Sequence, residues 1–85
     1  MVNLTTPGQR LRYFINLYGE FIGIENLYEK YKEKVLKVKN SKEVPEEKLN
    51  KLTDTFRYWL QGLENGNINK NEALEDMKKK LGDNS

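Results

Sequence analysis

Apolar side chains recur every three or four residues in four segments of the chain, which is the period of an α-helix with one buried face. We predict helices over residues 7–22, 24–39, 45–64 and 70–81. No segment alternates β-branched and polar residues in the pattern of a strand. The sequence therefore predicts an all-α fold, a small irregular four-helix bundle that forms a single domain over residues 1–85.

The first helix carries a start signal and a stop signal in its own sequence. Thr6 is a favoured N-cap residue, Pro7 fits the first helical position, and Gln9 stands three residues after the cap, as in a capping box. Gly23 is placed to end the helix, because glycine adopts the left-handed conformation of a C-terminal cap without strain.

The other boundaries rest on similar signals. Asn40–Val44 is a polar linker, and Pro45 fits the first turn of the third helix. In the last helix, Asn69 is the expected N-cap, Glu72 follows it by three residues, and Gly82 is the expected C-terminal cap.

Each predicted helix has one apolar face that we expect to form the core. In the first helix it comprises Leu11, Phe14, Ile15, Tyr18 and Ile22, and in the second Ile24, Leu27, Tyr28, Tyr31, Val35 and Val38. In the third helix it comprises Leu49, Leu52, Phe56, Trp59, Leu60 and Leu63, and in the fourth Leu74, Met77 and Leu81. The third face follows the a/d spacing of a heptad pattern.

The composition removes most catalytic chemistry. The 85 residues include neither histidine nor cysteine. The usual zinc and haem ligands, disulfides, thiolate nucleophiles and the Ser-His-Asp mechanism are therefore all excluded. No two carboxylates are paired in an apolar setting that would tune their pKa values for acid-base work. We predict a protein that is not an enzyme and needs neither a cofactor nor a metal.

The polar segment between the last two helices does not change this prediction. Oxygen-bearing side chains alternate from Asn65 to Asn71, as in a calcium loop. An EF-hand requires glycine at the sixth position and glutamate at the twelfth, where this chain has Lys70 and Asp76. The segment is therefore interpreted as a connection rich in capping residues.

No targeting or membrane segment is expected. The first residues lack a basic region followed by an apolar one, so we expect a cytoplasmic protein. The most apolar stretch, 11–24, is interrupted by Arg12, Asn16 and Glu20 and is shorter than the roughly 20 residues that span a bilayer. These interruptions also disfavour binding on a membrane surface.

Four large apolar side chains fall outside the predicted core faces. These are Tyr13, Phe21, Leu36 and Tyr58. Large apolar side chains left outside a core mark a partner surface, or they wrap the edge of a small bundle. We predict a protein–protein interaction module that acts through these residues. Because so short a chain forms only a small core, the partner could be a second copy in a homodimer.

The alternative is a regulator that binds nucleic acid. The net charge is only +2, but residues 1–42 carry eight basic and four acidic side chains. The cations that would contact phosphates are Arg10, Arg12, Lys30, Lys34 and Lys37. The segment 8–14 resembles the opening helix of phage-type helix-turn-helix repressors, but the helix after it departs from their pattern and offers no side chains suited to base edges.

A second resemblance concerns the third predicted helix. The segment Phe56-Arg57-Tyr58-Trp59-Leu60-Gln61-Gly62 resembles a segment of small, uncharacterised helical proteins of tailed bacteriophages. The resemblance implies a phage or prophage accessory protein and no particular activity.

Overall fold

The computed structural model describes residues 6–82, with the exception of the Ser41 side chain. It contains the α-helices α1 (Pro7–Ile22), α2 (Leu27–Tyr31), α3 (Glu46–Asn65) and α4 (Lys70–Leu81). A π-helical segment, η1 (Lys32–Leu36), continues directly from α2, and a short 3-10 turn, η2 (Ser41–Glu43), precedes α3.

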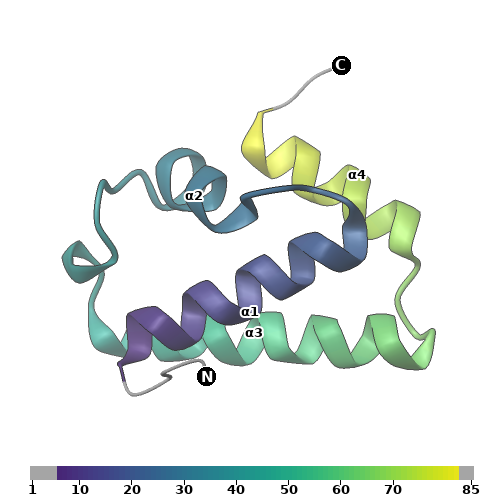
Figure 1. Cartoon of the computed structure of the whole chain (residues 1–85), viewed down its shortest axis with the longest axis horizontal. Coiled ribbons are helices and arrows are strands. Elements are labelled where there is room, and N and C mark those ends of the chain that lie inside the picture. The colour runs from purple at the N-terminus through teal and green to yellow at the C-terminus, as the bar shows by residue number, and fades with distance from the viewer. Residues whose placement is uncertain (1–5, 83–85) are drawn as a thin grey trace.

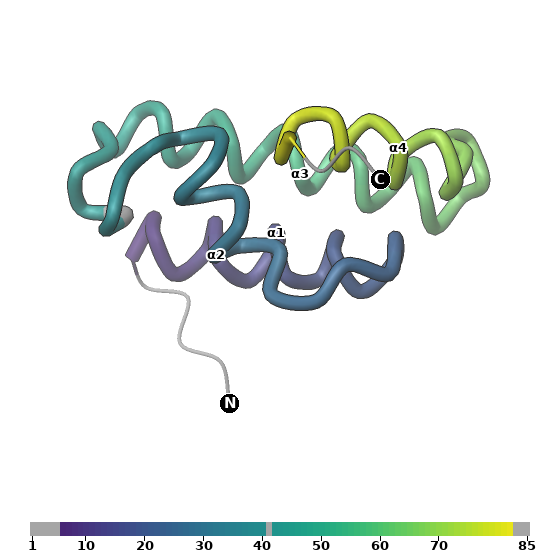
Figure 2. The backbone as a smooth tube through the Cα atoms, turned by 90° about the horizontal axis from the view of Figure 1, so that it is seen from above, coloured from purple at the N-terminus to yellow at the C-terminus, as the bar shows by residue number. Residues whose placement is uncertain are grey.

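The four helices form an all-α bundle in which α1 is the central element. α1 and α3 pack along one another and run in the same direction, while α2 and α4 lie above them in the view of Figure 1. Figure 2 shows α1 along one side of the molecule and α3 and α4 along the other, with the α2–η1 segment crossing between the two sides. Because α1 contacts α2, α3 and α4, its apolar face forms the middle of the core.

Both boundaries of α1 are confirmed. The Thr6 hydroxyl accepts a hydrogen bond from the Gln9 backbone N–H at 3.3 Å. At the other end, Gly23 has φ 84° and donates its N–H to the Gly19 carbonyl at 2.8 Å. Each end of the helix is therefore closed by a residue adjacent to it in sequence.

The boundaries of the last two helices differ from the predicted ones only in detail. Pro45 directly precedes α3, with an extended ψ of 143°, and is not part of its first turn. Gly66 and Gly82 end α3 and α4 in left-handed conformations, as their positions require. The Asn69 side chain caps α4 by accepting from the Asn71 N–H at 2.8 Å.

The predicted helix 24–39 is wrong in extent and in type. α2 begins three residues later, after Asn26 turns the chain in a left-handed conformation (φ 53°), and its α-helical hydrogen bonding ends at Tyr31. The π-helical η1 follows and stops at Lys37, which also has a positive φ of 56°. The backbone N–H groups of both Lys37 and Val38 donate to the Lys32 carbonyl, so this end is tightly closed.

An aromatic cluster joins three helices at the centre of the core. Phe56 of α3 is fully buried and meets Tyr18, Tyr31 and Trp59 edge-on, at ring-centroid distances of 5.4, 5.3 and 5.1 Å. This geometry is the preferred arrangement for aromatic pairs. Phe56 therefore connects α1, α2 and α3 through one side chain.

The buried face of α3 is rotated from the predicted one. Leu49, Thr53, Phe56 and Leu60 are buried, whereas Leu52, Trp59 and Leu63 are only partly covered. Thr53 can be buried because its hydroxyl donates to the Leu49 carbonyl at 2.7 Å. A polar residue at a core position is invisible to a search for apolar spacing.

In α4 and α1 the buried residues also differ from the predicted ones. Ala73 is buried while Leu74 is only partly covered, and Phe14 is partly covered although it was expected in the core.

Candidate functional site

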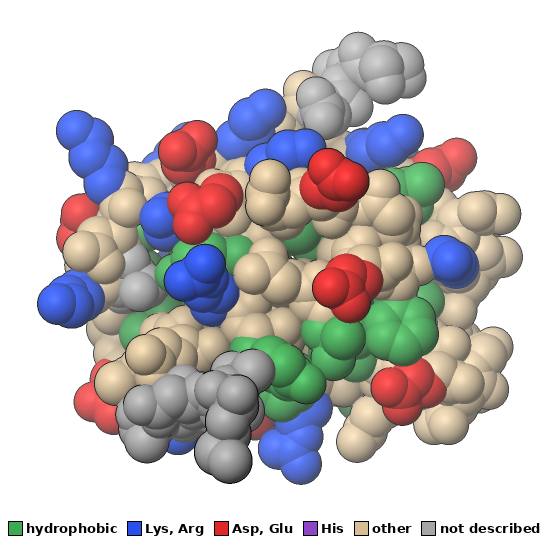
Figure 3. Space-filling view, viewed as in Figure 1, with side chains coloured by type: hydrophobic (Ala, Val, Ile, Leu, Met, Phe, Trp, Pro, Cys, Tyr) green, Lys and Arg blue, Asp and Glu red, His purple; other side chains and the backbone are tan. Residues whose placement is uncertain are grey.

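The outer flank of α1 is a partly exposed apolar surface, which we define as Tyr13, Phe14, Leu17 and Phe21. Positions 14, 17 and 21 follow helical spacing and point about 90° away from the buried stripe of the same helix. Tyr13 is 38% exposed and meets Phe14 edge-on at 5.3 Å. Figure 3 shows one face of the molecule, and apolar side chains gather in its lower half, on the side of α1 that borders α3.

The structure brings two of the four predicted partner residues onto this flank and leaves two elsewhere. Tyr13 and Phe21 lie on the outer flank, and Phe21 also packs partly against the core. Leu36 lies in η1 and is likewise partly buried against the core. Tyr58 is 71% exposed on α3 and, with Ile68, borders a small pocket of about 180 Å³ beside the α3–α4 turn.

Sequence reasoning missed the rest of this flank. Phe14 was counted as core and Leu17 was not assigned to any surface. The signal was present, because residues 14, 17 and 21 form a second apolar stripe beside the stripe 11, 15, 18 and 22. A helix with two apolar stripes can bury both only if a neighbour covers each of them.

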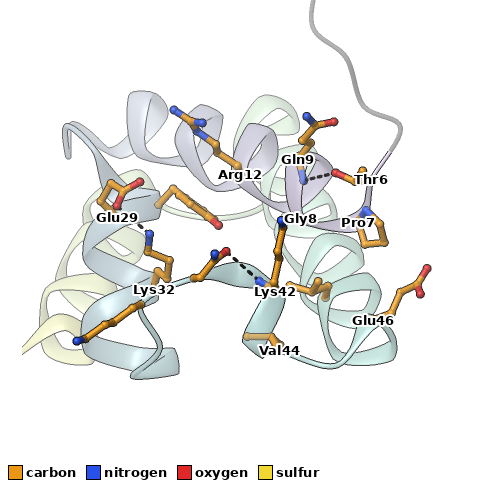
Figure 4. A pocket seen from close by; sticks show the side chains of 14 residues that line it. Thr6, Pro7, Gly8, Gln9, Arg12, Glu29, Lys32, Lys42, Val44 and Glu46 are labelled. Carbon is orange, nitrogen blue, oxygen red and sulfur yellow. Dashed lines mark hydrogen bonds and ion pairs between the residues drawn. The ribbon is translucent and has the colours of Figure 1, made fainter.

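A second candidate is an open cleft of about 760 Å³ between the start of α1, α2 and the start of α3. Its fourth wall is the connection that follows η1. Four cationic side chains line it: Arg12, Lys32, Lys39 and Lys42 (Figure 4). The two carboxylates at the cleft are Glu29, which forms an ion pair with Lys32 at 3.1 Å, and Glu46.

The predicted nucleic-acid residues are divided by the fold. Arg10 and Arg12 lie on opposite flanks of α1, about 200° apart around the helix. The Arg10 guanidinium donates to the Asn50 side chain of α3 at 3.4 Å, whereas Arg12 lines the cleft beside α2. Lys30, Lys34 and Lys37 are exposed and do not line the cleft.

The lysines that do line the cleft were mostly overlooked. Lys42 lies in the segment interpreted as a linker, and Lys39 was placed at the end of the predicted helix 24–39, so neither was assigned to a binding surface. Only the fold brings this segment beside the first turn of α1.

The buried tyrosines hold their protons more tightly than free tyrosine does. Burial, with a further contribution from the carboxylate of Asp76, raises the pKa of Tyr18 to about 12. Burial also raises the pKa of Tyr31 above its usual value. Both hydroxyls are therefore protonated at neutral pH and serve as parts of the core.

Two kinds of feature are absent from residues 6–82. No helix there has the length and apolar character needed to cross a bilayer. No three acidic side chains of the same part of the chain are grouped as ligands for a metal ion.

Comparison of the chain with protein families, with curated proteins and with solved structures finds no match.

Proposed function

We propose that this protein is a non-enzymatic protein-binding module and that its partner contacts the outer flank of α1. The observation that carries the proposal is the outer flank of α1, which includes three aromatic rings and is only partly covered by the rest of the chain. Aromatic side chains that are half exposed contribute strongly to protein interfaces, because a partner removes the remaining surface from water.

A second copy of the chain is the partner that we propose first. A flank of this kind can pack against its own symmetry mate in a two-fold dimer. Tyr58 adds a separate exposed ring on α3 that a larger partner could reach. The origin in a phage or prophage, implied by the segment 56–62, stays a prediction.

Sedimentation of three variants tests the proposal. Tyr13→Ala removes the most exposed ring of the flank and should weaken self-association or partner capture about tenfold. Tyr58→Ala tests the separate ring, and Lys51→Ala is a control at an exposed position of α3. Circular dichroism of each variant establishes that it is folded.

The outcomes separate the possible interfaces. A loss with Tyr13→Ala alone supports the outer flank. A loss with Tyr58→Ala alone places the interface on α3 and contradicts the proposal. Two results together would show that the protein-binding proposal is wrong. The wild-type chain would sediment as a monomer at every concentration, and every host protein that the wild-type chain captures would also be captured by Tyr13→Ala.

The alternative function is nucleic-acid binding, and the cations at the cleft are the observation that favours it. It ranks second because a polyanion would have to pass from the cleft to the far flank of α1 to reach both Arg10 and Arg12. Affinity for duplex DNA that falls steeply with salt, and that drops in the Arg10→Ala/Arg12→Ala double variant, would support it. Absence of binding at roughly 50 mM salt would exclude it, because the electrostatic attraction is strong there.

A further inference from the structure

The open cleft that Arg12, Lys32, Lys39 and Lys42 line combines charge from several elements of the fold. Arg12 comes from α1, Lys32 from η1, and Lys39 and Lys42 from the connection before α3. In Figure 4, Lys42 extends toward Gly8 in the first turn of α1 and Lys32 extends toward Glu29, while Arg12 and Glu46 point away from the hollow. Because Lys32 is paired with Glu29, the cleft offers Arg12, Lys39 and Lys42 as the cations outside that ion pair.

The cleft is also lined by a tyrosine whose ring is buried and whose hydroxyl has no hydrogen-bond partner among the described residues. Tyr28 is only 6% exposed, and its hydroxyl makes no hydrogen bond to any residue that the structure describes. No fully buried side-chain oxygen or nitrogen among those residues lacks a partner, so this hydroxyl must contact solvent. Tyr28 lines the cleft, and its hydroxyl is therefore a donor available to a ligand there.

The first turn of α1 adds a positive potential at the same place. The Gln9 N–H donates to the Thr6 hydroxyl, and Pro7 has no backbone N–H. The Gly8 N–H has no acceptor among the described residues. The positive end of a 16-residue helix attracts an anion. The Lys42 side chain extends toward this turn in Figure 4, where the two positive groups would share a negative ligand.

We infer that the cleft binds a small molecule that carries a phosphate group. Lysine, arginine, a tyrosine hydroxyl and a free backbone N–H are the donors that phosphate oxygens accept. The volume of about 760 Å³ lies in the usual range of small-molecule pockets. Pro7, Val44 and Leu49 give the cleft an apolar wall for the rest of the ligand.

A nucleic acid fits these observations less well. A polymer needs a row of phosphate contacts along a surface, whereas these donors surround one hollow. Glu29 and Glu46 border the hollow and would repel a continuous polyanion that extended beyond it. The cleft is a different surface from the outer flank of α1. The phosphate-binding inference can therefore fail while the proposed protein-binding function holds, and the protein-binding function can fail while the inference holds.

The test is a titration of the ¹⁵N-labelled chain with inorganic pyrophosphate at roughly 50 mM salt. The readout is the NMR spectrum of the backbone amides. We expect saturable shifts at Gly8, Tyr28 and Lys42. Tyr28→Phe retains the buried ring but removes the hydroxyl, and Lys42→Ala removes one cation. Each should weaken binding about ten- to a hundredfold, the usual effect of one hydrogen bond to a charged group. Lys78→Ala, at an exposed position of α4, should leave the affinity unchanged.

Three results would overturn the inference. One is the absence of saturable shifts up to about 10 mM pyrophosphate, beyond the weakest affinity that matters for a specific site. Another is an equal loss with Lys78→Ala, which would indicate non-specific attraction. The third is binding of a short DNA duplex at these amides without binding of pyrophosphate, which would assign the cleft to nucleic acid. The same spectra show whether each variant is folded.

Discussion

α1 and the α2–η1 segment both bury an apolar face against Phe56 of α3, but they are held in different ways. α1 is closed at its start by Thr6 and at its end by Gly23, both adjacent to it in sequence. The N-cap residue of α2, Asn26, makes no side-chain cap. Its cap comes from α1 instead, where the Asn16 side chain accepts from the Tyr28 N–H at 3.2 Å.

The close contact between α1 and α2 depends on a missing side chain. A Cβ on Gly19 would lie 2.7 Å from the Ile24 carbonyl oxygen and 2.8 Å from the Leu27 Cβ. Glycine at this position therefore lets α2 begin directly against α1. α1 therefore contains its own caps, whereas α2 depends on a cap from α1 and forms only when the bundle is assembled.

The largest expected effect comes from the side chain that joins the two regions. Phe56→Ala should reduce the free energy of unfolding by about 3–5 kcal/mol, because it opens a cavity at the contact with both Tyr18 and Tyr31. Urea unfolding followed by circular dichroism measures the loss. Trp59→Ala is the comparison, and its loss should be smaller because the indole is only partly buried. An equal or larger loss with Trp59→Ala would contradict this description of the core.

The second prediction concerns stability at high pH. Tyr18 has a pKa of about 12 in the folded chain against 10.0 for the free side chain, so folding favours its neutral form. The contribution to stability is complete below pH 10 and is lost as the pH rises toward 12, by on the order of 2 kcal/mol. Unfolding measured between pH 8 and pH 12 should show this decline, and Tyr18→Phe should flatten it. A variant with the same pH profile as wild type would contradict the prediction.

The third prediction tests the close approach of α2 to α1. Gly19→Ala should destabilise the chain by about 1–2 kcal/mol, because the clash outweighs the better helix propensity of alanine. Thermal unfolding measures the change. Glu20→Ala, at the exposed neighbouring position, should have little effect. If Gly19→Ala stabilises the chain, α2 does not need this contact.

The fourth prediction tests the cap that α1 provides. Asn16→Ala should cost about 1 kcal/mol and should speed hydrogen exchange in residues 28–36 more than in α1. Asn16→Asp retains the acceptor and should restore most of the protection. Uniformly faster exchange along the whole chain would show that Asn16 does not act locally on α2.

The smallest expected effect is a gain. Lys37 holds a left-handed conformation that favours glycine, so Lys37→Gly should stabilise the chain by about 0.5–1 kcal/mol. Lys34→Gly, inside η1 and outside the left-handed region, should destabilise it. Chemical unfolding of the two variants gives the signs, and the same sign for both would contradict the assigned backbone conformation.

The sequence by itself determined the fold class and the ends of the helices that carry their own caps. Thr6, Gly23, Asn69 and Gly82 act through hydrogen bonds and backbone conformations within a few residues, so a local pattern is enough to find them. Tyr58 was likewise placed outside the core by its phase, and it is exposed.

Only the tertiary structure decided the course of the chain from Ile24 to Val44 and the surfaces that depend on it. The cap from Asn16 and the space left by Gly19 each join α1 to the start of α2, and Thr53 is buried although it is polar, so no apolar pattern within one helix predicts them. The cleft follows the same rule, because Arg12 and Lys42 line one cleft only once η1 ends and the chain turns back toward α1. A periodic pattern records which side of a helix is apolar, but the neighbour that covers it is selected by packing across the whole bundle.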